Sequence, residues 1–183
     1  MESKKLTQFF NRNEDFSFIN RLPESDQLAL SVAMEEFAAT DTENYSPSLY
    51  SQRLLNRLNL QVDRSIFTRV SKDLEFEFWT AQGKLLGSSN GFYALSSFTL
   101  EELFRKERSQ LFQRDQKYTD QLISGIGLAL QGTIVENPVE VHTVTEIKIN
   151  PVSVSVDIKL ITPLYNESGL IVGVAAFLKL KKI

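Results

Sequence analysis

The sequence predicts an α+β protein, because its hydrophobic periodicity changes once along the chain. Up to about Leu74 the apolar residues recur at helical spacing, and from Glu75 they alternate with a period of two, as in strands. The apolar run 170–180 is hydrophobic on both faces, which predicts a central strand covered from both sides. Together these patterns predict an antiparallel sheet with helices on one face and N-terminal helices covering the other.

The N-terminal segment, residues 1–72, is predicted to be this helical cover or a dimerisation segment. Pro23 suits the first turn of a helix, and Glu24 lies where the helix dipole favours negative charge. Ser46 and Pro47 form the N-cap and first-turn pair of a second helix. The spacing of apolar residues predicts a third helix over 66–74.

An apolar stripe on this third helix predicts a surface for self-association. It is formed by Ile66, Phe67 and Val70. We expect the stripe to be exposed and to serve as a homodimer interface.

The remaining residues, 73–183, are predicted to form the sheet and its own helices. A hairpin over 75–88 turns at Gly83, and Thr99 with Glu102 matches a capping box for a short helix. A longer amphipathic helix is predicted from 116 to 130, with Gly132 at its end. Three further strands are predicted over 139–144, 152–160 and 170–180.

The composition excludes several classes of chemistry. The 183 residues contain no Cys and one His, which removes disulfides, thiolate metal sites, cysteine nucleophiles and paired-His metal sites. With 20 Lys+Arg against 23 Asp+Glu, the net charge of −3 argues against binding dominated by phosphate contacts. No apolar run is long enough for a transmembrane helix, and no secretory signal is recognisable, so we expect a cytoplasmic protein without membrane insertion.

Three stretches of sequence resemble the PAS domain family. SNGFYALSSFTLEELF (89–104) is similar to the family's Asn-aromatic turn and following helix, and LFQRDQKYTDQLISGIGLALQG (111–132) is similar to its next helix. ITPLYNESGLIVGVAAF (161–177) resembles its final hairpin. The resemblance covers about residues 73–181 and rests on the order and spacing of the three pieces.

The resemblance implies a five-stranded antiparallel sheet of order 2-1-5-4-3, with any ligand between the sheet and the intervening helices. Aromatic residues in this region are more often core than ligand contacts, so both interpretations stay open. The candidate pocket residues are Trp79, Phe92, Tyr93, Phe98, Leu103, Phe104 and Tyr118.

The resemblance also limits the cofactors. A covalent flavin adduct needs a Cys, and haem ligation from the long helix needs a His between 116 and 130, and both are missing from the sequence. The cofactor, if there is one, is unknown and bound noncovalently. His142 is expected to be an exposed strand residue near Glu140 and Glu146, and we predict no metal site.

No catalytic constellation is recognisable, so we predict that the protein is not an enzyme. The Ser and Thr hydroxyls lack a suitable base, and adjacent carboxylates such as Glu35 and Glu36 point in different directions on a helix.

The function predicted from sequence is a sensory or signalling module. It would bind a small molecule noncovalently or a protein partner, a second copy included, and transmit the change through its helical cover. The alternative is a winged-helix-like DNA-binding regulator over 46–89, with Arg64, Arg69 and Lys72 facing DNA. The balance of charge makes nucleic acid the less favoured partner.

Overall fold

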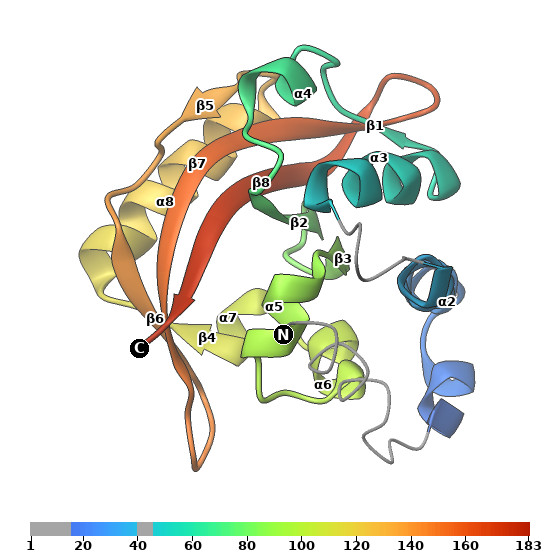
Figure 1. Cartoon of the computed structure of the whole chain (residues 1–183), viewed down its shortest axis with the longest axis horizontal. Helices are drawn as coiled ribbons and strands as arrows, with labels where there is room; N and C mark the ends of the chain where they lie inside the picture. Colours follow the sequence, from blue (N-terminus) through green and yellow to red (C-terminus); the bar gives the residue numbers. More distant parts are fainter. Residues whose placement is uncertain (1–15, 40–45) are drawn as a thin grey trace.

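A computed structural model describes residues 16–39 and 46–183, and it has the predicted α+β class (Figure 1). The predicted segment 1–72 therefore lies partly outside the described residues. Its described elements are η1 (Phe16–Arg21), α2 (Glu24–Ala39), α3 (Pro47–Arg57), β1 (Leu60–Gln61) and α4 (Ile66–Arg69). The later elements are β2 (Glu75–Thr80), β3 (Leu85–Ser88), α5 (Asn90–Leu95), α6 (Leu100–Arg105), α7 (Arg108–Leu111), β4 (Phe112–Gln113), α8 (Gln116–Leu130), β5 (Val135–Glu136), β6 (His142–Glu146), β7 (Ser153–Asn166) and β8 (Ile171–Lys182).

The strand order of the sheet is β3-β2-β8-β7-β6-β4, and all described pairings are antiparallel. Its first five strands reproduce the order 2-1-5-4-3 that the resemblance to PAS domains implied, so this prediction is confirmed. The predicted number of five strands is too small, because the sheet of the described residues has eight: β4 extends it beyond β6, and β1 and β5 also pair with β7, all three as two-residue strands that the sequence pattern did not predict.

The N-terminal segment contributes to the sheet itself. The edge of β7 that faces away from β8 pairs in turn with β6, β5 and β1, at Ser153, Ile161 and Asn166 respectively. β1 lies in the chain between α3 and α4, before the predicted boundary at residue 72. The segment is thus more than a layer of helices lying on the sheet.

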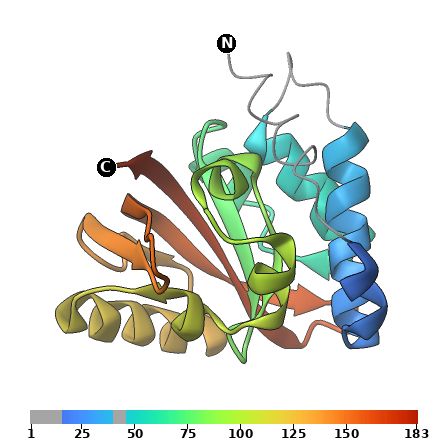
Figure 2. The ribbon, with the colours of Figure 1, turned by 90° about the horizontal axis from the view of Figure 1, so that it is seen from below.

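Two cores lie on opposite faces of the sheet, with α8 on one side and α3 on the other (Figure 2). Strand β8 lies between β2 and β7 and contributes to both, with Val174 in the core on the α8 side and Phe177 in the core on the α3 side. This confirms the central, two-sided strand that its apolar run predicts. β2 divides in the same way, since Phe76 and Phe78 belong to the core below α3, whereas Trp79 belongs to the other.

Helix α2 lies along the outermost strand of the sheet, β3. Its Leu30 belongs to the core shared with α5 and α6, and its Val32 belongs to the core shared with α3. The helix therefore covers an edge strand that would otherwise present its backbone groups to solvent.

The helix boundaries follow local signals in the sequence. Thr99 Oγ1 accepts a hydrogen bond from Glu102 N at 3.1 Å, and Thr99 N donates to Glu102 Oε2 at 3.0 Å, so the predicted capping box is present. Asp115 caps α8 by accepting from Lys117 N at 2.9 Å. The helix is followed by Gly132, whose φ of +96° suits glycine.

Two predicted elements differ from the structure. The predicted helix 66–74 is the single turn α4, because the chain is extended at Val70 and turns again before Leu74. The predicted strand 139–144 is β6, displaced toward the C-terminus, and its inward-facing residues are His142, Val144 and Glu146. The even-numbered residues thus face inward, which buries a histidine and a carboxylate that the sequence pattern placed on a polar face.

Candidate ligand-binding cleft

A cleft of about 480 Å³ lies between α8 and the face of the sheet that it covers. Its volume falls in the range of about 300–1,000 Å³ that small-molecule sites occupy. Most apolar residues of its walls come from three elements. These are Leu122, Ile123 and Ile126 of α8, Ile158 and Ile161 of β7, and Val174, Ala176 and Leu178 of β8. The cleft lies where the resemblance to PAS domains implied a ligand.

A short segment, residues 107–114, lines one end of the cleft. Arg108 N donates to the carbonyl oxygen of Gly83 at 3.0 Å, which ties the segment to the β2–β3 turn. Glu107 caps α7 through a capping box with Gln110, and Phe112 pairs with Glu146 of β6. The segment is therefore attached to both ends of the sheet, and it carries two arginines toward the cleft.

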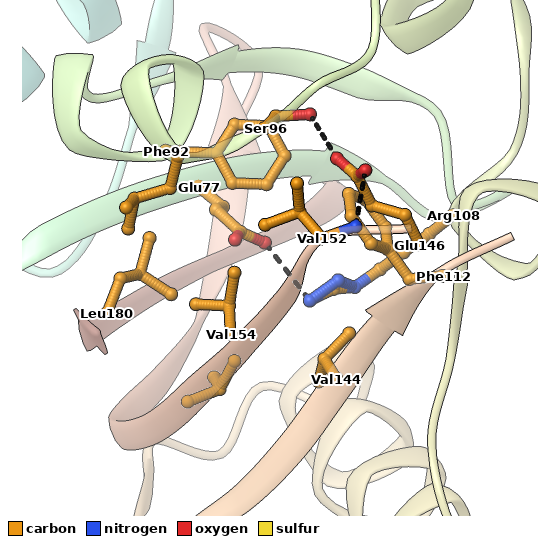
Figure 3. A pocket seen from close by; sticks show the side chains of 12 residues that line it. Glu77, Phe92, Ser96, Arg108, Phe112, Val144, Glu146, Val152, Val154 and Leu180 are labelled. Carbon is orange, nitrogen blue, oxygen red and sulfur yellow. Dashed lines mark hydrogen bonds and ion pairs between the residues drawn. The ribbon is translucent and has the colours of Figure 1, made fainter. Parts of the chain in front are cut away.

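Glu77 is a buried carboxylate at this end of the cleft, with 2% of its surface exposed. Trp79 Nε1 donates to Glu77 Oε2 at 2.8 Å, and Arg108 Nη2 lies 3.4 Å from the same oxygen. Figure 3 shows Glu77 and Arg108 facing each other in a smaller cavity, which shares these two residues and Phe112 with the cleft. A buried charge needs such a partner, because it loses its hydration.

The Arg108 guanidinium also contacts two aromatic rings, at 5.1 Å from the ring centre of Trp79 and 5.7 Å from that of Phe112. Such cation–π contacts hold the planar group but satisfy none of its N–H donors. Arg108 Nη1 is buried and has no hydrogen-bond partner within the described part of the chain. Buried donors in native proteins are almost always paired, so this one is free to bind a water molecule or a ligand.

Arg114 and His142 form a second polar pair beside the cleft. The side chain of Arg114 lines the cleft, and its Nη1 lies 3.1 Å from His142 Nε2. His142 Nδ1 lies 2.8 Å from the carbonyl oxygen of Glu140. Because that oxygen can only accept, the neutral ring carries its proton on Nδ1, and Nε2 accepts from Arg114.

Burial and positive charge set the pKa values of this pair. Burial, followed by the charge of Arg108, lowers the pKa of Arg114 to about 9, and the carboxylate of Glu77 offsets only part of this. The pKa of His142 also lies below its usual value, mainly through burial, with smaller contributions from Arg114 and Arg108. His142 is therefore neutral at pH 7, and Glu77 is the buried carboxylate that lines the cleft together with the two arginines.

A cavity of about 30 Å³ extends from the Glu77–Arg108 pair toward Glu146 (Figure 3). Glu146 accepts hydrogen bonds from Ser96 Oγ at 3.1 Å, Ser97 N at 2.6 Å and Val152 N at 3.1 Å, and a further one from Ser97 Oγ. These donors account for the burial of its charge, so Glu146 joins the α5–α6 connection to the β6–β7 turn rather than facing a ligand.

The predicted pocket residues are distributed over different environments. Trp79 lines the cleft, and Phe92 lines the smaller cavity. Tyr93, Phe98, Leu103 and Phe104 are buried in the core beside them, and Tyr118 stacks on His142 with 5.0 Å between ring centres. Binding by these side chains stays a prediction.

The prediction of an exposed His142 is wrong, because the ring is 5% exposed and faces inward from β6. Sequence reasoning also missed Glu77, Arg108 and Arg114. For Glu77 the sequence held only a partial signal: the residue lies two positions before the predicted pocket residue Trp79 and so on the same face of the strand, but the alternation of EFEFWT fits a solvated face equally well.

The stripe predicted to be an exposed dimer interface faces the protein's own sheet. Ile66 is fully buried in the core below α3, and Phe67 and Val70 pack against the same core. Phe67 contacts Phe177 edge to face, with 6.3 Å between ring centres. The prediction that the stripe is exposed is wrong, while homodimerisation itself stays a prediction.

The geometry also contradicts the winged-helix alternative. Its recognition helix would be α4, which has four residues, and its wing would be the β2–β3 hairpin, which is part of the central sheet. One of its three cationic residues, Arg69, forms an ion pair with Glu136.

Two further features are absent from the described residues. None of their helices is long and apolar enough to cross a membrane. Within the same ranges, 16–39 and 46–183, no group of three or more His, Cys, Asp or Glu residues could hold a metal ion.

Comparisons with known proteins give matches among solved structures alone. No family model matches the chain, and no curated protein does either. The light-state structure of the blue-light photoreceptor Aureochrome1 LOV is 14% identical with a TM-score of 0.41, covering 66% of this chain and 88% of that one. A PAS domain of a protein from Colwellia psychrerythraea is 15% identical with a TM-score of 0.41, covering 58% of this chain and 84% of that one.

These likenesses are too distant to carry any statement about a ligand of this chain. The fold is instead defined by the chain's own strand order, by its curled sheet and by helix α8 packed on one face of that sheet. The fold is PAS-like.

Proposed function

We propose that this PAS-like protein is a sensory module that binds a small molecule noncovalently in the cleft between α8 and the sheet. The observation that carries the proposal is the cleft itself, about 480 Å³ in volume, with apolar walls and a small number of converging polar groups at one end. That combination is typical of ligand sites in proteins. No catalytic reaction is needed to explain it.

Strand β2 offers a route from the cleft to the N-terminal segment. Glu77 and Trp79 line the cleft, while Phe76 lies on the opposite face of the strand. There the ring of Phe76 contacts Tyr50 of α3, with 5.5 Å between the ring centres. A ligand that shifts the side chains of β2 on one face would alter the packing of α3 on the other. We propose that residues 1–72 pass this change to a signalling partner, a second copy of the chain included.

The proposal is tested by filling the cleft. Ala176 lies on β8 in the cleft wall, and an Ala176→Phe substitution would occupy the space that a ligand needs. Native mass spectrometry of the protein purified from its own host should show a bound small molecule, and this adduct should be lost in the variant. Leu170→Phe, at an exposed residue outside the cleft, is the matched control and should keep the adduct.

Signal transmission is tested by hydrogen exchange. Ligand binding should change the exchange of α3, although that helix does not line the cleft. Two results together would contradict the proposed function. The wild-type protein would carry no adduct, and extracts of small molecules would leave the hydrogen exchange of α3 unchanged.

A further inference from the structure

The charges at the end of the cleft are unbalanced. Four charged residues line the cleft, and they are Glu77, Glu107, Arg108 and Arg114. Glu107 is exposed and caps α7, so it lies at the rim. Inside the cleft, the carboxylate of Glu77 faces two guanidinium groups. The other buried carboxylate nearby, Glu146, lines only the adjoining smaller cavity, and its oxygens are already taken up by hydrogen bonds from the Ser96 and Ser97 side chains and from backbone N–H groups.

Neither arginine uses its full donor capacity. A guanidinium carries five N–H donors, and Arg108 has one ion-pair contact at 3.4 Å together with the unpartnered Nη1. About a fifth of the Arg108 side chain, 19%, is still exposed, so a ligand can reach the residue. Arg114 contacts a neutral imidazole and forms no ion pair with any described residue.

A partly buried arginine without a carboxylate is costly to the folded state. Removing a guanidinium from water is unfavourable unless an anion replaces the lost hydration. The lowered pKa of Arg114 has the same cause, namely burial and the neighbouring charge of Arg108. The chain thus holds a positive charge at this position at a cost to its own stability, as binding sites often do.

We propose that the cleft takes an organic carboxylate with an apolar body, whose carboxylate binds Arg108 and Arg114 and whose body lies against Leu122 and Ile126 of α8. The proposal rests on the ligand-binding function proposed above and names the class of ligand. Arginine is the side chain best suited to a carboxylate, because its planar N–H groups match the two oxygens. The apolar walls require a body that a simple inorganic anion lacks.

Within this site Glu77 acts as the resident competitor of the ligand. It already occupies one edge of the Arg108 guanidinium, so an incoming carboxylate must share that group or displace Glu77 from it. Displacement would also disturb the bond from Trp79 Nε1 to Glu77 Oε2 and hence strand β2. Ligand binding and the change in β2 are linked through this carboxylate.

The test uses matched pairs of acids and amides with the same body. Octanoate is compared with octanamide, and 3-phenylpropanoate with 3-phenylpropanamide, by isothermal titration calorimetry at low salt. We expect at least one acid to bind tenfold or more tightly than its amide, and tighter than acetate. Equal binding of acid and amide would overturn the proposed ligand class and leave the cleft function standing.

Two substitutions should act in opposite directions on the acid. Arg114→Gln removes the unpaired charge while keeping a donor for His142 Nε2, and it should weaken acid binding about tenfold. Glu77→Gln removes the competitor while keeping an acceptor for Trp79 Nε1, and it should strengthen acid binding. Neither should change amide binding by more than about twofold, and Arg105→Gln, at an exposed arginine, is the control.

The sole histidine gives an independent readout within the intact protein. A bound carboxylate would offset the charges of Arg108 and Arg114, which lower the pKa of His142, so its imidazole NMR titration should move to higher pH. Acid binding without this shift would place the acid elsewhere and overturn the proposal. If no acid or amide binds and none perturbs α8 resonances, the proposed ligand class and the cleft function both fail.

Discussion

The two faces of strand β2 differ in almost every physical respect. Toward α3, Phe76 and Phe78 lie in a fully buried aromatic layer, with 4.7 Å between their ring centres. Toward α8, Glu77 and Trp79 line an open cleft that is also lined by charged side chains. The close-packed aromatic face stabilises the fold. The buried charges and the open space on the other face lower the stability, which is typical of binding sites.

Burial has opposite energetic effects on the two faces of β2. Phe76 and Glu77 are equally inaccessible, at 0% and 2% exposed. For Phe76 burial is the source of the stabilisation, because apolar surface leaves water. For Glu77 burial is a cost that Arg108 and Trp79 offset in part. Substitutions on the two faces should therefore behave differently.

The largest effect is expected on the packed face. Phe76→Ala would remove a fully buried ring that contacts Tyr50 and Phe78, at a cost of about 3–5 kcal/mol in the free energy of unfolding. Urea denaturation followed by tryptophan fluorescence measures the change. A loss below about 1 kcal/mol would show that the α3 layer is loosely packed.

On the cleft face, the cost should depend on which charge is left behind. Arg108→Met leaves Glu77 buried without its counter-ion, and we expect a loss of about 3 kcal/mol. The double variant Glu77→Gln/Arg108→Met removes both charges and keeps an acceptor for Trp79 Nε1, so it should be more stable than Arg108→Met alone. A double-mutant cycle in urea measures the coupling. Additive losses would mean that the pair does not interact.

The folded-state architecture was largely predictable because it follows from patterns within the chain. The two-sided apolar run at 170–180 requires a central strand, and β8 is central in the sheet. The capping box at Thr99 is a local signal, and the structure has it. The strand order was implied by the resemblance to PAS domains, which rests on the order and spacing of three stretches of the sequence.

The charged end of the cleft was not predictable, because it depends on contacts between distant parts of the chain. An alternating stretch such as EFEFWT fits a strand with one solvated face, and only the segment 107–114 buries Glu77. Arg114 and His142 meet across 28 residues. The stripe at Ile66 shows the same limit, since periodicity identifies an apolar face without showing what covers it.

The pH dependence of stability gives a smaller effect, also on the cleft face. The pKa of His142 in the folded protein lies below 6.5, so the unfolded chain takes up the proton first as the pH falls. The stabilising effect of a neutral His142 is present above about pH 6.5 and is lost progressively below it. The nearby Lys117 stays charged over this range, because its hydrogen bond to Glu140 raises its pKa.

His142→Gln keeps a side-chain acceptor for Arg114 and removes the titration. The free energy of unfolding, measured by urea denaturation from pH 7 to pH 5, should therefore fall less steeply with decreasing pH in the variant than in the wild type. Identical slopes would show that the imidazole titrates normally and that its surroundings are more polar than its burial indicates.

The smallest effect is expected at an arginine three residues before Arg108 in the chain. Arg105 forms an exposed pair with Glu101 at 2.6 Å, one helical turn away in α6. Such pairs contribute about 0.3–0.5 kcal/mol, because water and salt screen the charges. Arg105→Met should therefore change the free energy of unfolding by no more than this amount, against about 3 kcal/mol for Arg108→Met. Equal losses would mean that both substitutions act through helix propensity or lost side-chain packing, and the contrast between a packed face and a charged cleft would no longer explain either arginine.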